Sequence, residues 1–242
     1  MQLSLLASFK NETWNLREWL EHYVWQGVTR FYLIDNGSTD NPMDVVESFR
    51  QSRPDISVFV YSWSAPHRQR EHYQKAIAEN LDGIVEKSEW ILVCDLDEFL
   101  FSRVPGKRLS DLEFPSDGDV VRVHERVFGS DGHEKHPRGN IRRAFLHRRP
   151  GLGYETKYFF RPQRVKELNI HQADDAGISV SFLDDKIGFN HYQIQSLDFY
   201  RHIKMTRGDG CCGALDTSRN MELFSALDSE ATCYDDELVR LL

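Results

Sequence analysis

The first part of the chain alternates short apolar runs with longer amphipathic stretches. Four apolar runs predict strands buried on both faces, at residues 2–8, 31–35, 56–63 and 90–93. The stretches between them have the spacing of helices. The clearest helix lies between Glu12 and Gly27 and carries an apolar stripe on one side, formed by Leu16, Trp19, Leu20, Tyr23 and Val24.

Two further helices are expected, at about residues 42–50 and 68–87. The alternation of strands and helices predicts an α/β fold in which a parallel sheet is wound with helices. The end of the chain differs, because residues 207–216 are glycine-rich and predict a linker. Two short amphipathic patterns follow and predict a helical extension that covers the donor site, packs on the sheet or binds a partner. We therefore expect a main domain over residues 1–208 and an extension over residues 209–242.

The fourth apolar run ends in a cluster of acids. Asp95, Asp97 and Glu98 directly follow residues 90–93, which predicts acids at the C-terminal end of a central strand, where open α/β sheets bind ligands. Asp95 and Asp97 are two residues apart, so on an extended strand both would point the same way and could bind one divalent cation. Solvated acids at an exposed strand end are the alternative, and in either case we expect these acids to matter little for stability.

Polar residues also follow the first two strands, at the edge of the sheet where the acids lie. The first strand runs into Ser8, Lys10, Asn11 and Glu12. The second strand runs into Asp35, Asn36, Gly37 and Ser38. Asp35 could accept a hydrogen bond from a base or a ribose hydroxyl. For Gly37 and Ser38, a turn and a helix cap are an equally good interpretation.

Composition and charge narrow the class of protein. The chain has 242 residues, 40% of them hydrophobic, and a net charge of −8, which argues against a nucleic-acid partner. Its basic residues are concentrated at residues 138–149. That segment is either a solvated face or a site for a phosphate, an acidic acceptor or a membrane surface.

The sequence also indicates a compartment. The start has no basic region before its short apolar run, and no stretch approaches the length of a membrane span. The four cysteines form no C-x-x-C pair, so neither a disulfide framework nor a zinc site is expected; they are Cys94, Cys211, Cys212 and Cys233. We therefore expect a cytoplasmic protein, with peripheral association at the inner face of the membrane as an open alternative.

Several motifs carry a resemblance to a known class of enzyme. In the first half they are K-N-E-x(6)-W-L-x-H-Y, G-V-x-x-F-Y-L-I-D-N-G-S-T-D and Q-x(20)-D-L-D-E-F. In the second half they are F-G-S-D-G-H, K-x-x-x-R-P, N-H-Y-x-x-x-S and K-x-x-R-G. Over residues 3–208 the chain resembles nucleotide-sugar glycosyltransferases, most of all the family 2-like and family 92-like enzymes. Two residues depart from the pattern: Gln195 stands where a lysine is expected, and Glu125 where a tryptophan is common.

The resemblance implies a fold and a reaction. The fold would be the Rossmann-like GT-A fold, an α/β fold with a mostly parallel central sheet wound with helices, plus the short C-terminal helical extension. The resemblance implies metal-dependent transfer of a sugar from a nucleotide-sugar donor, expected to be UDP-linked, to a hydroxyl of a glycan or lipid-linked acceptor, with inversion. Mn²⁺ or Mg²⁺ would be the cofactor, since both suit hard oxygen ligands.

The resemblance also implies roles for individual residues. Asp95 and Asp97 would bind the metal together with a later histidine, His171 or His191, of which we favour His171. The residues expected to bind the nucleotide sugar are Ser8, Lys10, Asn11, Glu12, Asp35, Asn36, Ser38, Gln74, Asp95, Lys157, His191, Lys204 and Arg207.

An inverting transfer needs a general base for the acceptor hydroxyl. The sequence offers Glu125, Asp131 and His133 in one loop, and it does not choose between these and the nearby acids Glu134, Asp184 and Asp185. Two other functions stay open. A sugar-phosphate nucleotidyltransferase is disfavoured because residues 7–12 lack the glycine-rich loop of such enzymes. A non-catalytic glycan-binding or scaffold protein is disfavoured because the acids are intact.

Overall fold

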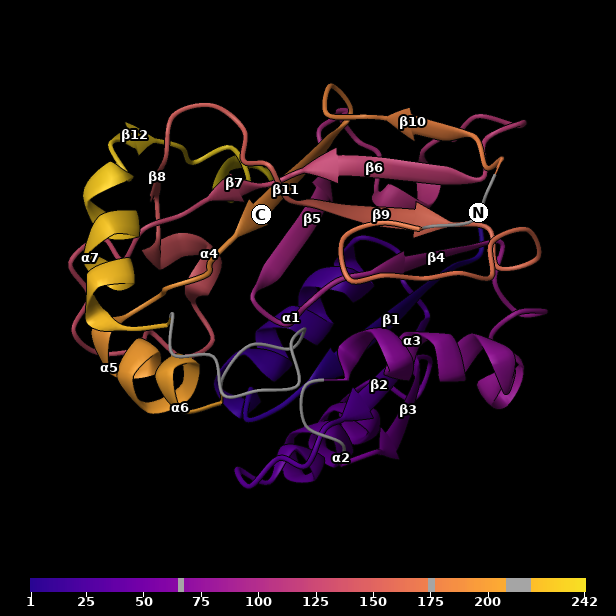
Figure 1. Cartoon of the computed structure of the whole chain (residues 1–242), viewed down its shortest axis with the longest axis horizontal. Coiled ribbons are helices and arrows are strands. Elements are labelled where there is room, and N and C mark those ends of the chain that lie inside the picture. The colour runs from indigo at the N-terminus through magenta and orange to yellow at the C-terminus, as the bar shows by residue number, and fades with distance from the viewer. Residues whose placement is uncertain (65–67, 174–176, 208–218) are drawn as a thin grey trace.

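A seven-stranded sheet with the strand order β10-β6-β9-β4-β1-β2-β3 forms the centre of the molecule (Figure 1). The computed structural model describes residues 1–64, 68–173, 177–207 and 219–242. Four of the six strand pairings in this sheet are parallel, and only β9 runs antiparallel to its neighbours β4 and β6. The mostly parallel α/β fold expected from the sequence is therefore confirmed.

The first half of the chain forms the predicted series of strands and helices. Its elements are β1 (Leu3–Phe9), α1 (Thr13–Trp25), β2 (Arg30–Asp35), α2 (Pro42–Ser52), β3 (Ser57–Ser62), α3 (Gln69–Ala78) and β4 (Trp90–Val93). The third helix is shorter than predicted, because Asn80 and Asp82 have positive φ angles of 48° and 46°. Such angles cannot continue a right-handed helix, so the chain passes through a 3₁₀ turn, Leu81–Gly83, instead.

The acids after β4 do not lie on an extended strand, which corrects the prediction. β4 ends at Val93, and Asp95 and Asp97 lie in a turn. The turn leads into β5 (Glu98–Ser102), which belongs to a separate three-stranded sheet with β11 (Ile187–His191) and β7 (Arg126–Val127). Because the chain turns here, the two-residue spacing of the aspartates does not give their side chains a common direction.

The apolar stripe of α1 holds this turn in place. Trp19 and Tyr23 are fully buried between α1 and the sheet. The indole N–H of Trp19 donates to the backbone oxygen of Asp95 at 2.9 Å, and the hydroxyl of Tyr23 donates to that of Glu98 at 3.0 Å. α1 and α2 pack on one face of the central sheet and α3 on the other. The core thus fixes the backbone that carries the acids.

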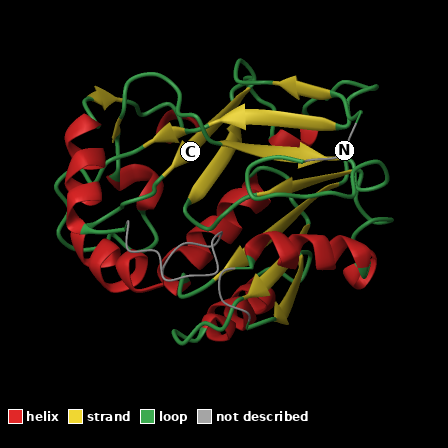
Figure 2. Cartoon of the chain, in the orientation of Figure 1, coloured by secondary structure: helices red, strands yellow, loops and turns green. Residues whose placement is uncertain are grey.

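Figure 2 shows strands through the middle of the molecule, helices at its flanks and long loops in the second half. The helices α5, α6 and α7 gather at the left of the view, away from α3 (Figure 1). The second half contains β6 (Val120–His124), α4 (Ile141–Ala144), β8 (His147–Arg148), β9 (Thr156–Phe160), β10 (Val180–Phe182), α5 (Leu197–Phe199), the π-helical turn Tyr200–Lys204 and α6 (Met205–Arg207). A short 3₁₀ turn, Leu109–Asp111, precedes them.

The C-terminal segment packs on the rest of the chain. It forms α7 (Met221–Glu230) and then β12 (Cys233–Tyr234), which pairs with β8. The second predicted helix is only a 3₁₀ turn, Val239–Leu241, and Leu238 before it is buried in the main core. The backbone of Cys233 and Tyr234 is paired with β8 and takes no part in a helix. Apart from Arg207, the predicted linker lies outside the described residues.

Several arginines of the basic segment 138–149 form ion pairs within the molecule. Arg142 pairs with Glu18, Arg148 with Asp235 and Arg149 with Glu230, at 3.0, 2.6 and 2.6 Å. These pairs connect the segment to α1 and to the C-terminal segment. In the part of the chain that the structure describes, no helix combines the length and the apolar character that crossing a bilayer requires.

Candidate active site

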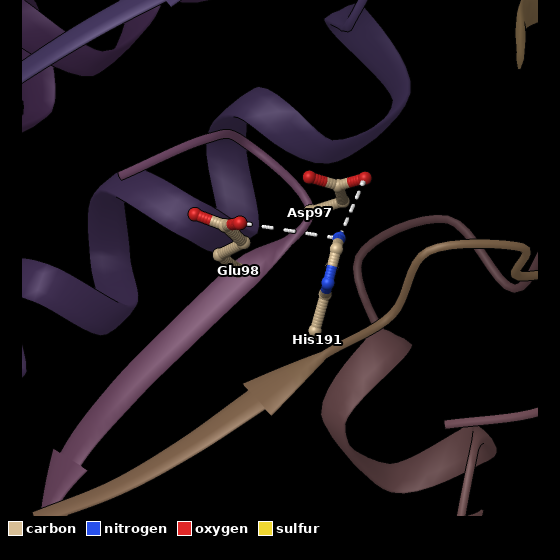
Figure 3. A group of neighbouring side chains, drawn as sticks. All are labelled: Asp97, Glu98 and His191. Carbon is tan, nitrogen blue, oxygen red and sulfur yellow. Dashed lines mark ion pairs between the residues drawn. The ribbon is translucent and has the colours of Figure 1, made fainter. Parts of the chain in front are cut away.

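The cluster formed by Asp97, Glu98 and His191 lies where the turn after β4 meets the end of β11 (Figure 3). Antiparallel pairing of β5 with β11 places Glu98 directly opposite His191. Nε2 of His191 lies 3.7 Å from a carboxylate oxygen of Asp97 and 3.9 Å from one of Glu98. The backbone N–H of Tyr192 also donates to the backbone oxygen of Asp97 at 2.9 Å. Strand pairing therefore brings together residues that are far apart in the sequence.

Asp97 and Glu98 are buried and Asp95 is partly buried, which corrects the expectation of an exposed strand end. Burial raises the pKa of Glu98 to about 8. Burial would also raise the pKa of Asp97, but the Lys204 ammonium and His191 outweigh it and hold that pKa well below its usual range. A buried carboxylate depends on its partners, because an uncompensated charge in the interior is strongly destabilising. Asp97 and Glu98 are thus integral to the folded structure.

Glu125 fixes the orientation of His191. A carboxylate oxygen of Glu125 lies 2.6 Å from Nδ1 of His191, so Nδ1 donates to it and Nε2 faces the two acids. Burial alone would lower the pKa of His191, but the carboxylates of Asp97 and Glu125 raise it well above its usual value. The arrangement of a carboxylate behind a histidine is typical of metal sites. A cation bound at Nε2 would displace the proton held there.

Cationic side chains accompany the acids. Nζ of Lys157 lies 2.7 Å from an oxygen of Asp95 and 3.4 Å from one of Glu98. Lys204, on the π-helical turn, is hydrogen-bonded to Asp97. Its neighbour Arg207 is hydrogen-bonded to Glu12 and donates to the backbone oxygen of Lys10 at 3.0 Å. The structure therefore brings five of the predicted donor-site residues into one network of alternating charge: Glu12, Asp95, Lys157, Lys204 and Arg207.

The loops after β1 and β2 are joined to each other. Asp35 accepts a hydrogen bond from the backbone N–H of Ser38 at 2.8 Å, and the Ser38 hydroxyl accepts one from the N–H of Asn11 at 2.9 Å. The backbone N–H of Asn36 donates to the oxygen of Phe9 at 2.8 Å. Ser8 is hydrogen-bonded to His72 of α3 at 2.8 Å. Asp35 and Ser38 thus belong to one turn. The expected helix cap is wrong, because the N-cap residue of α2 is Asn41 and not Ser38.

Two predicted site residues have other partners. Gln74 donates to the backbone oxygen of Leu168 at 2.9 Å, whereas Gln69, which the sequence analysis did not single out, donates to Asp95 at 2.5 Å. His171 lies near Glu155, with Nε2 3.8 Å from a carboxylate oxygen. Burial, followed by the charge of Lys157, lowers the pKa of His171. The structure groups Asp97 with His191 and Glu98, and not with Asp95 and His171.

Asp131 and His133 hold the loop that contains them. The carboxylate of Asp131 accepts hydrogen bonds from the backbone N–H groups of Leu146 and His147 and from the imidazole of His147. His133 is hydrogen-bonded to the backbone oxygen of Ala144 at 3.3 Å. Of the three residues expected to be catalytic, only Glu125 joins the cluster. Asp184 also lies outside the cluster and accepts a hydrogen bond from the backbone N–H of His124 at 2.7 Å.

Glu98, Gln69 and Glu155 are the site residues that sequence reasoning missed. Glu98 stands next to Asp97 in the acidic part of the sequence, but the sequence does not reveal that Glu98 is buried. Gln69 lies at the start of α3 in a segment without a local signal. Glu155 has a carboxylate oxygen within 4.8 Å of ligand atoms of both Glu125 and His191. That contact depends on how the loop before β9 folds back, which no local pattern indicates.

The sequence model of Glycosyltransferase family 92 matches residues 6–208. A family 92 protein of Oryza sativa subsp. japonica is 26% identical over 221 residues, which are 82% of this chain and 34% of that protein. One of Ricinus communis is 27% identical over 217 residues, 84% of this chain and 38% of that protein. The chain thus spans about a third of the length of these relatives.

Two solved structures share the fold. One is a mannosyltransferase from Pyrobaculum calidifontis in complex with GDP-Man and Mn²⁺, with a TM-score of 0.51 and 14% identity over 83% of this chain and 59% of that one. The other is GalNAc-T7 with UDP, GalNAc and Mn²⁺, with a TM-score of 0.51 and 9% identity over 95% of this chain and 48% of that one. At these identities the likeness establishes the GT-A fold.

Proposed function

The chain belongs to glycosyltransferase family 92, and we propose that it transfers a sugar from a UDP-linked donor to a hydroxyl group of a glycan or lipid-linked acceptor, with inversion. The observation that carries the proposal is the buried group of Asp97, Glu98 and His191 beside two lysines and an arginine. Such a group combines ligands for a cation with charges that can neutralise a diphosphate. Two neighbours of the same fold were solved with a nucleotide or nucleotide sugar and Mn²⁺, which supports this use of the site.

The residues of the cluster fit a divalent cation. Two carboxylate oxygens and one imidazole nitrogen lie within 4.8 Å of one another, and Glu125 orients the imidazole. Asp97 and His191 would hold Mn²⁺ or Mg²⁺, with Glu98 as a third ligand. The bound cation would supply positive charge to the departing diphosphate. Asp95, already paired with Lys157, would accept from donor hydroxyl groups instead.

The cations of the network would bind the donor phosphates. Lys204 contacts both Asp97 and, at 3.8 Å, Glu12. If Asp97 held a metal, Lys204 would no longer be needed in that ion pair and would donate to a phosphate oxygen. Arg207 reaches the backbone of Lys10 in the loop after β1 and would close the site on the nucleotide side. The joined loops after β1 and β2 would form the wall for base and ribose.

Glu125 and Glu155 would divide two roles on the acceptor side. Glu125 is buried and bound to His191, so its role is to position that imidazole. Glu155 lies beside it with a side chain that is 52% exposed. An accessible carboxylate next to the reacting groups suits the general base that inversion requires. Asp131 and His133 are occupied in their own loop and would support it.

The test is calorimetric titration with UDP in the presence and absence of Mn²⁺. Wild-type protein should bind UDP more tightly with Mn²⁺. Asp97→Asn and His191→Gln should each reduce that Mn²⁺-dependent gain by about 10- to 100-fold. His171→Gln is the matched control and should retain it. Absence of UDP binding by the wild type would favour a scaffold protein and refute the proposal.

A second measurement separates transfer from nucleotide activation. Wild-type protein should hydrolyse one member of a panel of nucleotide sugars slowly in the presence of Mn²⁺, with water as acceptor. A nucleotidyltransferase would instead release pyrophosphate from a nucleoside triphosphate and a sugar phosphate. Glu155→Gln should reduce the hydrolysis rate while UDP binding stays unchanged, since a general base acts on the nucleophile and not on the nucleotide.

A further inference from the structure

The loop between β8 and β9, residues 149–155, forms a ledge beside the metal-ligand cluster, and its backbone is fastened at both ends. The N–H of Arg149 donates to the oxygen of Val127 at 2.9 Å. The N–H of Gly153 donates to the oxygen of Glu125 at 2.8 Å, and the N–H of Glu125 donates to the oxygen of Glu155 at 3.1 Å. These backbone hydrogen bonds fix the conformation of the ledge, which therefore presents a defined surface.

Gly153 lets the ledge lie directly against the active site. A Cβ atom at this position would fall 2.4 Å from a carboxylate oxygen of Glu125. The other carboxylate oxygen of Glu125 is bonded to His191. One side chain therefore separates the backbone of the ledge from the imidazole that faces Asp97. Any larger residue than glycine would push the ledge away or displace Glu125.

The ledge presents apolar side chains to solvent. Tyr154 is fully exposed, at 102% relative exposure, and Leu152 is 53% exposed. Within the described part of the chain, Tyr154 has no ring contact and no side-chain hydrogen bond. An exposed aromatic ring on a fixed backbone can bind a ligand beside the reaction centre. Such a contact is favourable because it removes apolar surface from water.

We propose that Tyr154 is the stacking platform for a sugar ring of the acceptor, an inference that rests on the proposed glycosyl transfer. The apolar C–H face of a pyranose can cover the ring while its hydroxyl groups stay free for polar partners. Glu155, next in the chain and half exposed, is placed to accept from one of those hydroxyl groups. The acceptor would therefore be a glycan that offers a whole ring, and not a simple lipid alcohol.

The charges around the ledge favour a sugar over a membrane surface. Exposed aromatic residues also enter membrane interfaces, but there they act together with free basic residues. Here Arg148 pairs with Asp235 and Arg149 with Glu230, both at 2.6 Å. Glu155 adds a negative charge on the same loop, and the chain as a whole carries −8. An anionic bilayer would be repelled, whereas a neutral glycan would not.

Saturation-transfer NMR with methyl glycosides and short oligosaccharides, in the presence of UDP and Mn²⁺, tests the inference. Wild-type protein should saturate the ring protons of at least one glycan. Tyr154→Ala should weaken that binding by about tenfold or more, as for a buried aromatic contact, while Tyr154→Phe should retain it. Tyr234→Ala is the matched control, because Tyr234 is a second exposed tyrosine (61%) on β12.

The outcomes separate this inference from the proposed function. If Tyr154→Ala binds glycans as the wild type does, or if the wild type saturates none of them, the inference is wrong. UDP binding with Mn²⁺ would still stand in that case and keep the proposed transfer. Loss of binding to anionic vesicles by Tyr154→Ala, with glycan binding intact, would identify the ledge as a membrane contact and overturn the inference as well.

Discussion

His22 should make the fold sensitive to acid, and this sensitivity does not depend on any ligand. The residue is buried on α1. Its Nε2–H donates to the backbone oxygen of Leu100 at 2.7 Å. On the other side, the guanidinium of Arg142 lies 3.3 Å from Nδ1 and has only protons to donate, so Nδ1 must accept. Protonation of Nδ1 would break the hydrogen bond from Arg142 and would place the charged imidazole beside the guanidinium.

The size of the effect follows from the pKa. Burial, and then the charge of Arg142, lower the pKa of His22 from its ordinary 6.5 to about 3. Between these values the unfolded chain binds a proton that the folded chain does not, so stability falls as the pH falls. The contribution of the neutral His22 to the free energy of unfolding is fully present at pH values above the pKa of this histidine in the unfolded chain. It shrinks by about 2 kcal/mol on going from about pH 7.5 to pH 5 and by about 4 kcal/mol near pH 3.

The assay is urea unfolding at about pH 7.5 and at about pH 5, with EDTA present to remove bound cations. His22→Gln keeps an N–H for Leu100 and cannot be charged. Its free energy of unfolding should therefore change between the two pH values by about 2 kcal/mol less than that of the wild type. His202→Gln, at an exposed position, measures the effect of replacing a histidine elsewhere. Parallel stability curves for the wild type and His22→Gln would refute the reasoning.

Three further substitutions test how the packing supports the site. Gly153→Ala should displace Glu125 and weaken Mn²⁺-dependent UDP binding about tenfold or more in calorimetry; unchanged binding would contradict the close approach. Asp235→Asn should reduce the free energy of urea unfolding by about 2 kcal/mol or more, because two arginines of β7 and β8 lose a buried partner; a change near zero would mean that the pairs are not formed in solution. Gly188→Ala should lower stability by about 1–3 kcal/mol, since its Cβ would fall 2.3 Å from the ring of Phe101; an unchanged melting temperature would argue against the pairing of β5 with β11.

The sequence alone determined the architecture of the first half. Strands in a parallel sheet are covered on both faces, so each appears as a continuous apolar run that can be recognised locally. β1, β2 and β4 therefore lie close to their predicted positions. The ends of elements do not follow from such runs, because they depend on single backbone angles. The positive φ at Asn80, which follows the last turn of α3, is one example.

The tertiary structure alone decided which residues form the site. Both His171 and His191 follow extended segments, and local pattern could not separate them. The pairing of β5 with β11 separates them, because it sets Glu98 opposite His191 across the whole intervening chain. Glu125 then orients the imidazole, and burial raises the pKa of Glu98. Contacts of this kind join distant parts of the sequence, and their electrostatics depend on how deeply the fold buries them, so neither can be read from the spacing of residues along the chain.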